Sequence, residues 1–164
     1  MTTTAADYLE TYLQDHRAGA AMGADLARRL AEENAGTPYE SFLVGLAQEI
    51  EEDIAVLDDI MSRYDISKAK LKIAGAKVAE RIGRLKPNEQ FTSYSPLSRV
   101  LELEALRGGV QGKLALWDAL AVFAADDERL GVEEIAGLQA KAQRQLDGLR
   151  THHTMAAREA FARS

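Results

Sequence analysis

Apolar residues recur every three or four positions along this chain and never alternate strictly over a long stretch. This spacing places them on one face of an α-helix, whereas a half-buried strand would alternate apolar and polar residues one by one. Only three prolines and twelve glycines interrupt the pattern, so the helices are expected to be long. The periodicity therefore predicts an all-α fold.

The first part of the chain predicts a helical hairpin over residues 4–63. Thr4 and Asp7 fit a capping box at the start of a first helix, which Gly36 ends shortly after residue 34. In the segment TPYE at positions 37–40, the threonine can cap a second helix and the proline suits its first turn. The glutamate of that segment can complete a second capping box.

A crossover and a second hairpin account for the rest of the chain. A short amphipathic helix is expected over residues 67–85, followed by a loop over residues 86–95. Ser95 and Pro96 suit an N-cap and a first helical position, and they open a hairpin over residues 96–163 that turns near residues 126 and 127. We therefore predict a single domain over residues 1–164.

Two antiparallel hairpins joined by one long crossover describe the ferritin-like four-helix bundle, which the whole chain resembles in architecture. The resemblance implies an antiparallel four-helix bundle with a fifth, short crossover helix, although an up-and-down bundle of five helices would produce a similar pattern. The segments YLQDHRAGA at 12–20 and SPLSRVLELEAL at 95–106 also make the chain loosely similar to small uncharacterised helical proteins of GC-rich bacteria. That second likeness implies no activity.

Ferritin-like proteins that bind two irons take one Glu from each of two helices and an ExxH pair from each of the other two. The residues three positions before His16, His152 and His153 are Leu13, Leu149 and Arg150, so the chain contains no such pair. A ferritin-type di-iron centre is therefore not expected.

A buried polar cluster is expected in the middle of the bundle. His16 falls within the apolar face of the first helix, and Asp53 falls within that of the second. Because both helices rise about 1.5 Å per residue from the turn that joins them, these two side chains should lie at nearly the same height. Arg107, on the edge of the apolar face of the helix that begins at Pro96, and Tyr12, just below His16, would complete the cluster.

Three interpretations of this cluster stay open. A His16–Asp53 pair with Arg107 as a second donor could serve only to fix the register of the helices, because buried polar groups need partners. Alternatively, His16, Asp53 and Glu49 could hold one transition-metal ion, such as iron or manganese. A small-ligand or catalytic role is the third interpretation.

Charge is unevenly distributed along the chain, whose net charge is −6. Residues 1–65 carry 14 acidic and 4 basic side chains, whereas residues 68–86 carry 7 basic side chains and 1 acidic one. The basic segment could pack beside the acidic part of the same chain, or bind an anionic surface or an acidic protein. Its candidate contact residues are Lys68, Lys70, Lys72, Lys77, Arg81 and Arg84. Because the chain as a whole is acidic, nucleic acid is not an expected partner.

The helix that begins at Pro96 is apolar on two sides, and its second side contains glycines at 108, 109 and 112. Each glycine costs about 1 kcal/mol relative to alanine, so we expect another backbone to approach closely there. Either the crossover helix or a second subunit could do so. A homodimer contact is expected at Leu116, Leu120 and Phe123.

The chain has no Cys, which excludes disulfides, zinc–thiolate sites and thiol catalysis. No apolar run approaches 20 residues and the N-terminus lacks a secretory signal, so a cytoplasmic protein without a transmembrane segment is expected. We therefore expect a non-enzymatic helical bundle that acts as a structural or protein-interaction module and needs no cofactor. The alternatives are a ferritin-like metal-binding protein with an atypical site and an adaptor that uses the basic segment.

Overall fold

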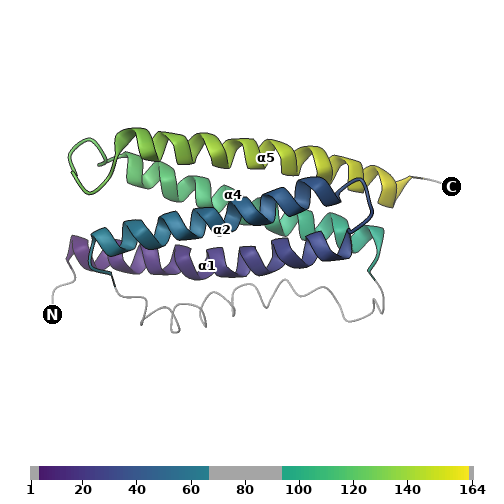
Figure 1. The fold of residues 1–164 in the computed structure, drawn as a ribbon, viewed down its shortest axis with the longest axis horizontal. Helices are drawn as coiled ribbons and strands as arrows, with labels where there is room; N and C mark the ends of the chain where they lie inside the picture. The colour runs from purple at the N-terminus through teal and green to yellow at the C-terminus, as the bar shows by residue number, and fades with distance from the viewer. Residues whose placement is uncertain (1–3, 67–93, 163–164) are drawn as a thin grey trace.

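A computed structural model describes residues 4–66 and 94–162, which form four long α-helices (Figure 1). The helices are α1 (Ala5–Glu33), α2 (Glu40–Arg63), α4 (Pro96–Ala121) and α5 (Val132–Phe161). The all-α prediction is therefore confirmed. The crossover helix expected at 67–85 and most of the loop expected at 86–95 lie outside the described residues.

The first and third of these helices begin at the predicted caps. The Thr4 hydroxyl accepts a hydrogen bond from the Asp7 amide at 3.3 Å, and the Asp7 carboxylate accepts one from the Thr4 amide at 2.8 Å. The Ser95 hydroxyl accepts from the Ser98 amide at 3.1 Å, and Pro96 is the first residue of α4. These side chains satisfy backbone N–H groups that have no partner within the helix.

The expected start of the second helix is wrong by two residues, because α2 begins at Glu40. Its N-cap residue, Tyr39, makes no capping side-chain hydrogen bond. The Glu40 carboxylate reaches back past Thr37 and accepts from the amide of Gly36 at 2.9 Å. Gly36 has a φ of 74°, which glycine adopts without strain, and this allows the tight turn between the two helices.

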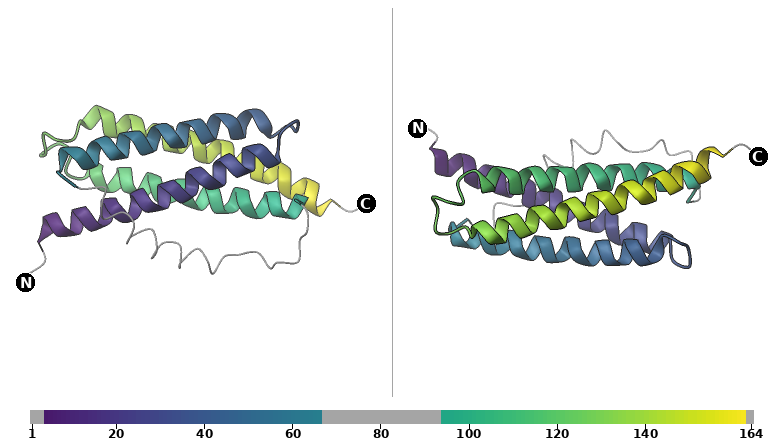
Figure 2. Two further views of the ribbon diagram at one scale, coloured as in Figure 1. Left: turned by 60° about the horizontal axis from the view of Figure 1, so that its bottom comes forward. Right: turned by 90° about the horizontal axis from the view of Figure 1, so that it is seen from above.

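Each helix packs against two neighbours, and the neighbours run antiparallel. The helix α1 contacts α2 and α4, and α5 contacts α4 and α2, so α2 and α4 lie diagonally across the bundle (Figure 2). Arg29 near the end of α1 pairs with Glu102 near the start of α4 at 2.7 Å. Arg63 at the end of α2 pairs with Glu134 near the start of α5 at 2.8 Å.

Core positions recur in every helix at alternating steps of three and four residues, which is the heptad spacing of supercoiled bundles. All of these positions are buried or half-buried. They are Leu9, Leu13, His16, Ala20, Gly23, Ala27 and Leu30 in α1; Leu43, Leu46, Ile50, Asp53, Leu57 and Ile60 in α2; Leu103, Leu106, Val110, Lys113, Trp117 and Leu120 in α4; and Ile135, Leu138, Ala142, Gln145, Leu149, His152 and Ala156 in α5.

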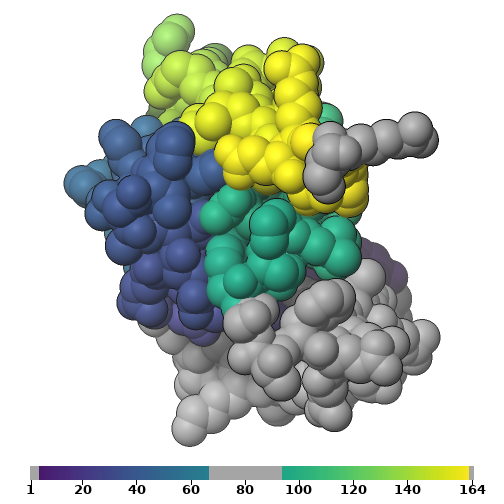
Figure 3. Space-filling model, turned by 90° about the vertical axis from the view of Figure 1, so that its right-hand side faces the viewer, coloured from purple at the N-terminus to yellow at the C-terminus, as the bar shows by residue number. Residues whose placement is uncertain are grey.

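Polar residues also meet at one end of the bundle, where the α1–α2 turn, the start of α4 and the end of α5 come together (Figure 3). Arg99 donates to the side-chain oxygen of Asn34 at 2.5 Å and to the carboxylate of Glu159 at 2.9 Å. Its guanidinium also lies over the Tyr39 ring, 4.6 Å from the ring centroid. These residues come from the α1–α2 turn, α4 and α5, so they connect the elements at this end of the bundle.

The expected dimer contact lies largely inside the chain's own core. Leu116 is 1% exposed and Leu120 is 0% exposed, and half-buried Phe123 packs against the same cluster. A second copy could reach the two leucines only by opening the bundle. Leu120 is a heptad core position and Leu116 directly precedes the core position of Trp117, because the heptad spacing moves the apolar face around α4 relative to the straight-helix expectation.

The close backbone approach expected at the α4 glycines involves the crossover helix, which lies outside the described residues, or a second subunit. A Cβ atom added at Gly108, Gly109 or Gly112 would meet no described atom within 4 Å. Among the described residues, no helix is long and apolar enough to cross a membrane.

Candidate functional site

A polar layer crosses the middle of the bundle, with one side chain from each helix. Its members are His16 of α1, Asp53 of α2, Lys113 of α4 and Gln145 of α5, all at heptad core positions. The layer divides the apolar core into two clusters, one toward the end with the α1–α2 turn and one toward the opposite end. The layer therefore interrupts the part of the bundle where apolar packing would be expected to be continuous.

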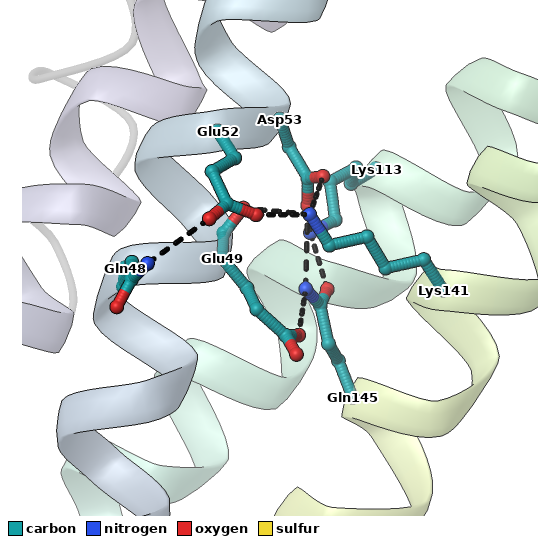
Figure 4. Close-up of polar contacts among 7 residues, drawn as sticks. All are labelled: Gln48, Glu49, Glu52, Asp53, Lys113, Lys141 and Gln145. Carbon is teal, nitrogen blue, oxygen red and sulfur yellow. Dashed lines mark hydrogen bonds and ion pairs between the residues drawn. The ribbon is translucent and has the colours of Figure 1, made fainter.

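Asp53 is the centre of this layer, and its side chain is only 5% exposed. Lys113 donates to its Oδ2 atom at 2.5 Å, and Lys141 of α5 pairs with its Oδ1 atom at 2.9 Å (Figure 4). Gln145 donates to Oδ2 from 3.3 Å. Two cations and an amide thus compensate the buried carboxylate, which would otherwise be costly to remove from water.

Further hydrogen bonds extend this network toward the surface between α2 and α5 (Figure 4). The side-chain oxygen of Gln145 accepts from Lys113, and its nitrogen donates to the Glu49 carboxylate at 2.8 Å. Lys141 also donates to the carboxylate of Glu52 at 3.0 Å. The orientation of the Gln145 amide is thereby determined, because its oxygen faces a cation and its nitrogen faces carboxylates.

The two lysines respond differently to this environment. Burial lowers the pKa of the Lys113 ammonium, and this effect outweighs the opposing attraction of Asp53. Burial also acts to lower the pKa of Lys141, but its hydrogen bonds with Asp53 and Glu52 prevail and raise it. The protein therefore stabilises the protonated form of Lys141 but destabilises the protonated form of Lys113.

His16 and Asp53 line the same pocket, but the expected His16–Asp53 hydrogen bond is not among the contacts of the described residues. In residues 4–66 and 94–162, the His16 ring makes no hydrogen bond to Asp53; it packs edge-on against the Tyr12 ring, with 4.5 Å between the centroids. Burial lowers the pKa of His16, with a smaller opposing effect from Asp15. Arg107 is exposed on α4, and Lys113 and Lys141 are the cations at Asp53.

A pocket of about 370 Å³ opens beside this layer, between α1, α2 and α4. Its apolar walls include side chains from both core clusters, and its polar groups are Asp15, His16, Asp53 and Lys113. Four of its lining residues are glycines, and a Cβ added at any of them would meet no described atom within 4 Å. These are Gly19 and Gly23 of α1 and Gly109 and Gly112 of α4.

The proposed metal ligands do not gather into a metal site. In the part of the chain that the structure describes, no group of three or more His, Asp or Glu side chains could hold a metal ion. Glu49 instead accepts a hydrogen bond from Gln145, and both oxygens of Asp53 are engaged by lysines. A metal ion at Asp53 would have to compete with two cations already bound to that carboxylate.

Sequence reasoning identified Asp53 and His16 but missed Lys113, Lys141 and Gln145. A heptad count along α4 and α5 would have placed both in the core, because Lys113 lies seven residues from buried Leu106 and Leu120, and Gln145 lies three and four residues from buried Ala142 and Leu149. The basic residues expected at the anionic-partner face, from Lys68 to Arg84, lie outside the described residues.

Comparisons with protein families, with curated proteins and with solved structures return no match for this chain, so its function has to be argued from the polar layer and the pocket.

Proposed function

We propose that this protein is a non-enzymatic binding protein that holds a small, mainly apolar molecule in the pocket between α1, α2 and α4. The observation that carries the proposal is the position of the pocket, which lies in the middle of the core beside Asp53 and Lys113. Helical bundles build their ligand and cofactor sites there, from side chains on facing helices. The proposal makes the chain a binding module whose partner is a small molecule.

The size and chemistry of the pocket support this function. Ligand pockets commonly range from about 300 to 1,000 Å³, with mostly apolar walls and a few polar groups that orient the ligand. The pocket of about 370 Å³ falls in this range, and its walls include Ile50, Leu57, Val110 and Trp117. Lys113 and His16, whose pKa values burial lowers, supply the polar groups.

The glycines of the pocket give a second argument. A glycine inside a helix costs about 1 kcal/mol relative to alanine, so a helix interior favours glycine only where a side chain would interfere. At Gly19, Gly23, Gly109 and Gly112, no described atom lies close enough to exclude a Cβ. A bound molecule would explain why these positions carry no side chain.

We propose binding rather than catalysis because the carboxylate of the layer is fully engaged. Asp53 Oδ2 accepts a hydrogen bond from Lys113, and Oδ1 is ion-paired with Lys141 and buried, which leaves the carboxylate poorly suited to accept a proton from a substrate. His16 has a ring contact with Tyr12 but no carboxylate orients it through a hydrogen bond among the described residues. The arrangement thus supports holding a molecule more than transforming one.

We also infer that the chain connectivity is ferritin-like. Support comes from the antiparallel α1–α2 and α4–α5 hairpins, whose connecting segment has to join the end of α2 to the distant start of α4. The proposed site differs from a ferritin-type centre because a lysine–aspartate pair occupies the middle of the bundle.

Binding can be tested with N-phenyl-1-naphthylamine, an uncharged fluorescent probe of apolar pockets. Trp117 is the only tryptophan of the chain and lines the pocket, so energy transfer from its indole to the probe reports binding at this place. We expect saturable, one-to-one enhancement of probe emission together with quenching of Trp117.

Filling the pocket provides the decisive comparison. Gly19→Leu and Gly112→Leu should each weaken probe binding at least tenfold while keeping or raising the melting temperature, because leucine favours the helix. The matched control is Gly137→Leu in α5, where an added Cβ is equally unobstructed but lies outside the pocket lining. If the pocket variants bind the probe as tightly as the control does, the proposed function is wrong.

A further inference from the structure

We infer that the molecule held in the pocket is uncharged and carries one oxygen acceptor, such as the carbonyl group of a ketone or ester, which binds the Lys113 ammonium. This inference rests on the proposed binding function and adds the chemical class of the ligand. It follows from counting the donors, acceptors and charges that face the pocket.

Lys113 supplies the donor. An ammonium group has three N–H donors, and Lys113 uses two of them on Asp53 Oδ2 and on the Gln145 side-chain oxygen. The third donor has no partner among the described residues. The Lys113 side chain lines the pocket and is 15% exposed, and we assign this third donor to a molecule bound there.

The pocket offers no comparable free acceptor at Asp53. Its Oδ2 atom accepts from Lys113 and Gln145. Its Oδ1 atom forms an ion pair with Lys141 at 2.9 Å without a hydrogen bond, and this atom is buried with almost no accessible surface. A ligand that brings an oxygen acceptor therefore satisfies an unfilled donor, whereas a ligand that brings only a donor finds one carboxylate oxygen occupied and the other buried from the surface.

Charge decides between a neutral acceptor and an anion. The ammonium of Lys113 is already paired with Asp53, and Lys141 is shared between Asp53 and Glu52. A ligand carboxylate at Lys113 would place a second negative charge close to the buried Asp53 carboxylate without a further cation. A carbonyl oxygen accepts the same hydrogen bond without that repulsion.

The apolar walls define the rest of the ligand. Ile54, Leu57, Leu106 and Val110 line the pocket and are each at most 9% exposed, so they offer contacts to a hydrocarbon body. The expected ligand class is thus a compact hydrocarbon or aromatic molecule with one carbonyl group at the Lys113 side.

Three molecules of nearly the same shape test this inference by displacement of N-phenyl-1-naphthylamine and by titration calorimetry. They are 4-butylacetophenone with a neutral carbonyl, 4-butylbenzoate with a carboxylate, and 1-butyl-4-isopropylbenzene with no acceptor. We expect the ketone to bind about tenfold more tightly than the hydrocarbon, and the carboxylate to bind more weakly than the ketone.

Two lysine variants identify the donor. Lys113→Met should reduce the affinity for the ketone to that for the hydrocarbon and leave the hydrocarbon affinity unchanged. Lys141→Met is the matched control, because it also removes an ammonium from Asp53 but does not line the pocket. It should preserve the preference for the ketone.

A double variant keeps the test independent of folding. If Lys113→Met is unstable, Asp53→Asn/Lys113→Met removes both charges of the pair and should lose the ketone preference in the same way. Equal affinities for ketone and hydrocarbon in the natural protein, or tightest binding of the carboxylate, would overturn this inference while leaving the proposed function intact. If neither the probe nor any of the three molecules binds, the proposed function itself fails.

Discussion

The Lys113 ammonium of α4 and the Asp53 carboxylate of α2 meet across the diagonal of the bundle, with 2.5 Å between Nζ and Oδ2. The two helices share few direct contacts, because α1 and α5 lie on either side of that diagonal. The ion pair therefore links the two hairpins through the centre of the core. It also separates the two apolar clusters and borders the pocket.

The importance of this pair can be measured by removing one charge and then both. Asp53→Ala should lower the free energy of unfolding by about 3–5 kcal/mol, because it leaves the ammonium of Lys113 buried without its counter-ion. Asp53→Ala/Lys113→Met should regain most of that loss, since it removes both charges. Urea unfolding followed by circular dichroism measures the difference.

Glu52→Ala is the control for these variants. Glu52 also pairs with Lys141, but its side chain is 54% exposed, so its removal should change the free energy of unfolding by less than about 1 kcal/mol. A double variant that is no more stable than Asp53→Ala alone would contradict the assigned role of Lys113.

His16 should make stability depend on pH in mildly acidic solution. Because burial lowers the pKa of the folded-state imidazole below 6.5, the unfolded chain takes up the proton more readily as the pH falls. The free energy of unfolding should therefore decrease below pH 6.5, down to the pKa of the folded state, and should be unaffected by His16 above that pH. The slope is positive with pH throughout that window.

His16→Gln removes the titrating ring and should flatten this part of the pH profile. The comparison isolates His16 from Asp15 and the other carboxylates, because these groups are present in both proteins. Denaturant unfolding at closely spaced pH values provides the measurement. A variant whose profile keeps the full slope of the natural protein would show that His16 is not the group responsible.

Gly148 of α5 should not tolerate a methyl group. A Cβ added there would lie 2.9 Å from Cζ of Phe42 and closer still to Cε2, while the same ring stacks on His152 with 3.9 Å between the centroids. Gly148→Ala should therefore force Phe42 to move, and overpacking of this kind costs about 1–3 kcal/mol.

Gly137→Ala in the same helix supplies the matched comparison. Nothing lies within 4 Å of an added Cβ at Gly137, so this variant should gain about 1 kcal/mol from the greater helix propensity of alanine. Differential scanning calorimetry should thus give Gly148→Ala the lower melting temperature of the two. Equal melting temperatures would mean that the Phe42 ring is not held in its place between α2 and α5.

Tyr64 should be the last of the five tyrosines to ionise. Burial, together with the hydrogen bond that its hydroxyl donates to Asp127 at 2.8 Å, raises the pKa of Tyr64 to about 12. An absorbance titration at alkaline pH should show this late component, and Tyr64→Phe should remove it. Asp127→Asn should move the component to lower pH, because it removes the carboxylate charge beside the phenol.

The helices themselves could be predicted where local chemistry determines them. Thr4 with Asp7, and Ser95 with Pro96, mark helix starts through hydrogen bonds and backbone angles that span only a few residues. The start of α2 was less predictable. There the Glu40 carboxylate was expected to accept from the amide of Thr37. It accepts instead from the amide of Gly36, whose positive φ sets the geometry of the turn.

The candidate site was only partly predictable, and Lys113 shows why. A straight helix of 3.6 residues per turn drifts by about 20° per heptad against the 3.5-residue repeat of a supercoiled bundle. Over the length of α4 this drift moves Leu116 and Leu120 from the expected outer side into the core, and it brings Lys113 to a core position. It also leaves Arg107 exposed, although a straight-helix projection placed it beside Asp53.

The sequence by itself determined an all-α chain with capped helices, and it placed Asp53 on a buried face, because periodicity and capping act within a few turns of one helix. Only the tertiary structure decided which cations meet Asp53 and where the core leaves a pocket. Those outcomes depend on the supercoil and on the side chains of four helices at once. The sequence of one helix cannot predict that Lys113 lies opposite Asp53, because the two residues belong to different hairpins and meet only when the bundle assembles.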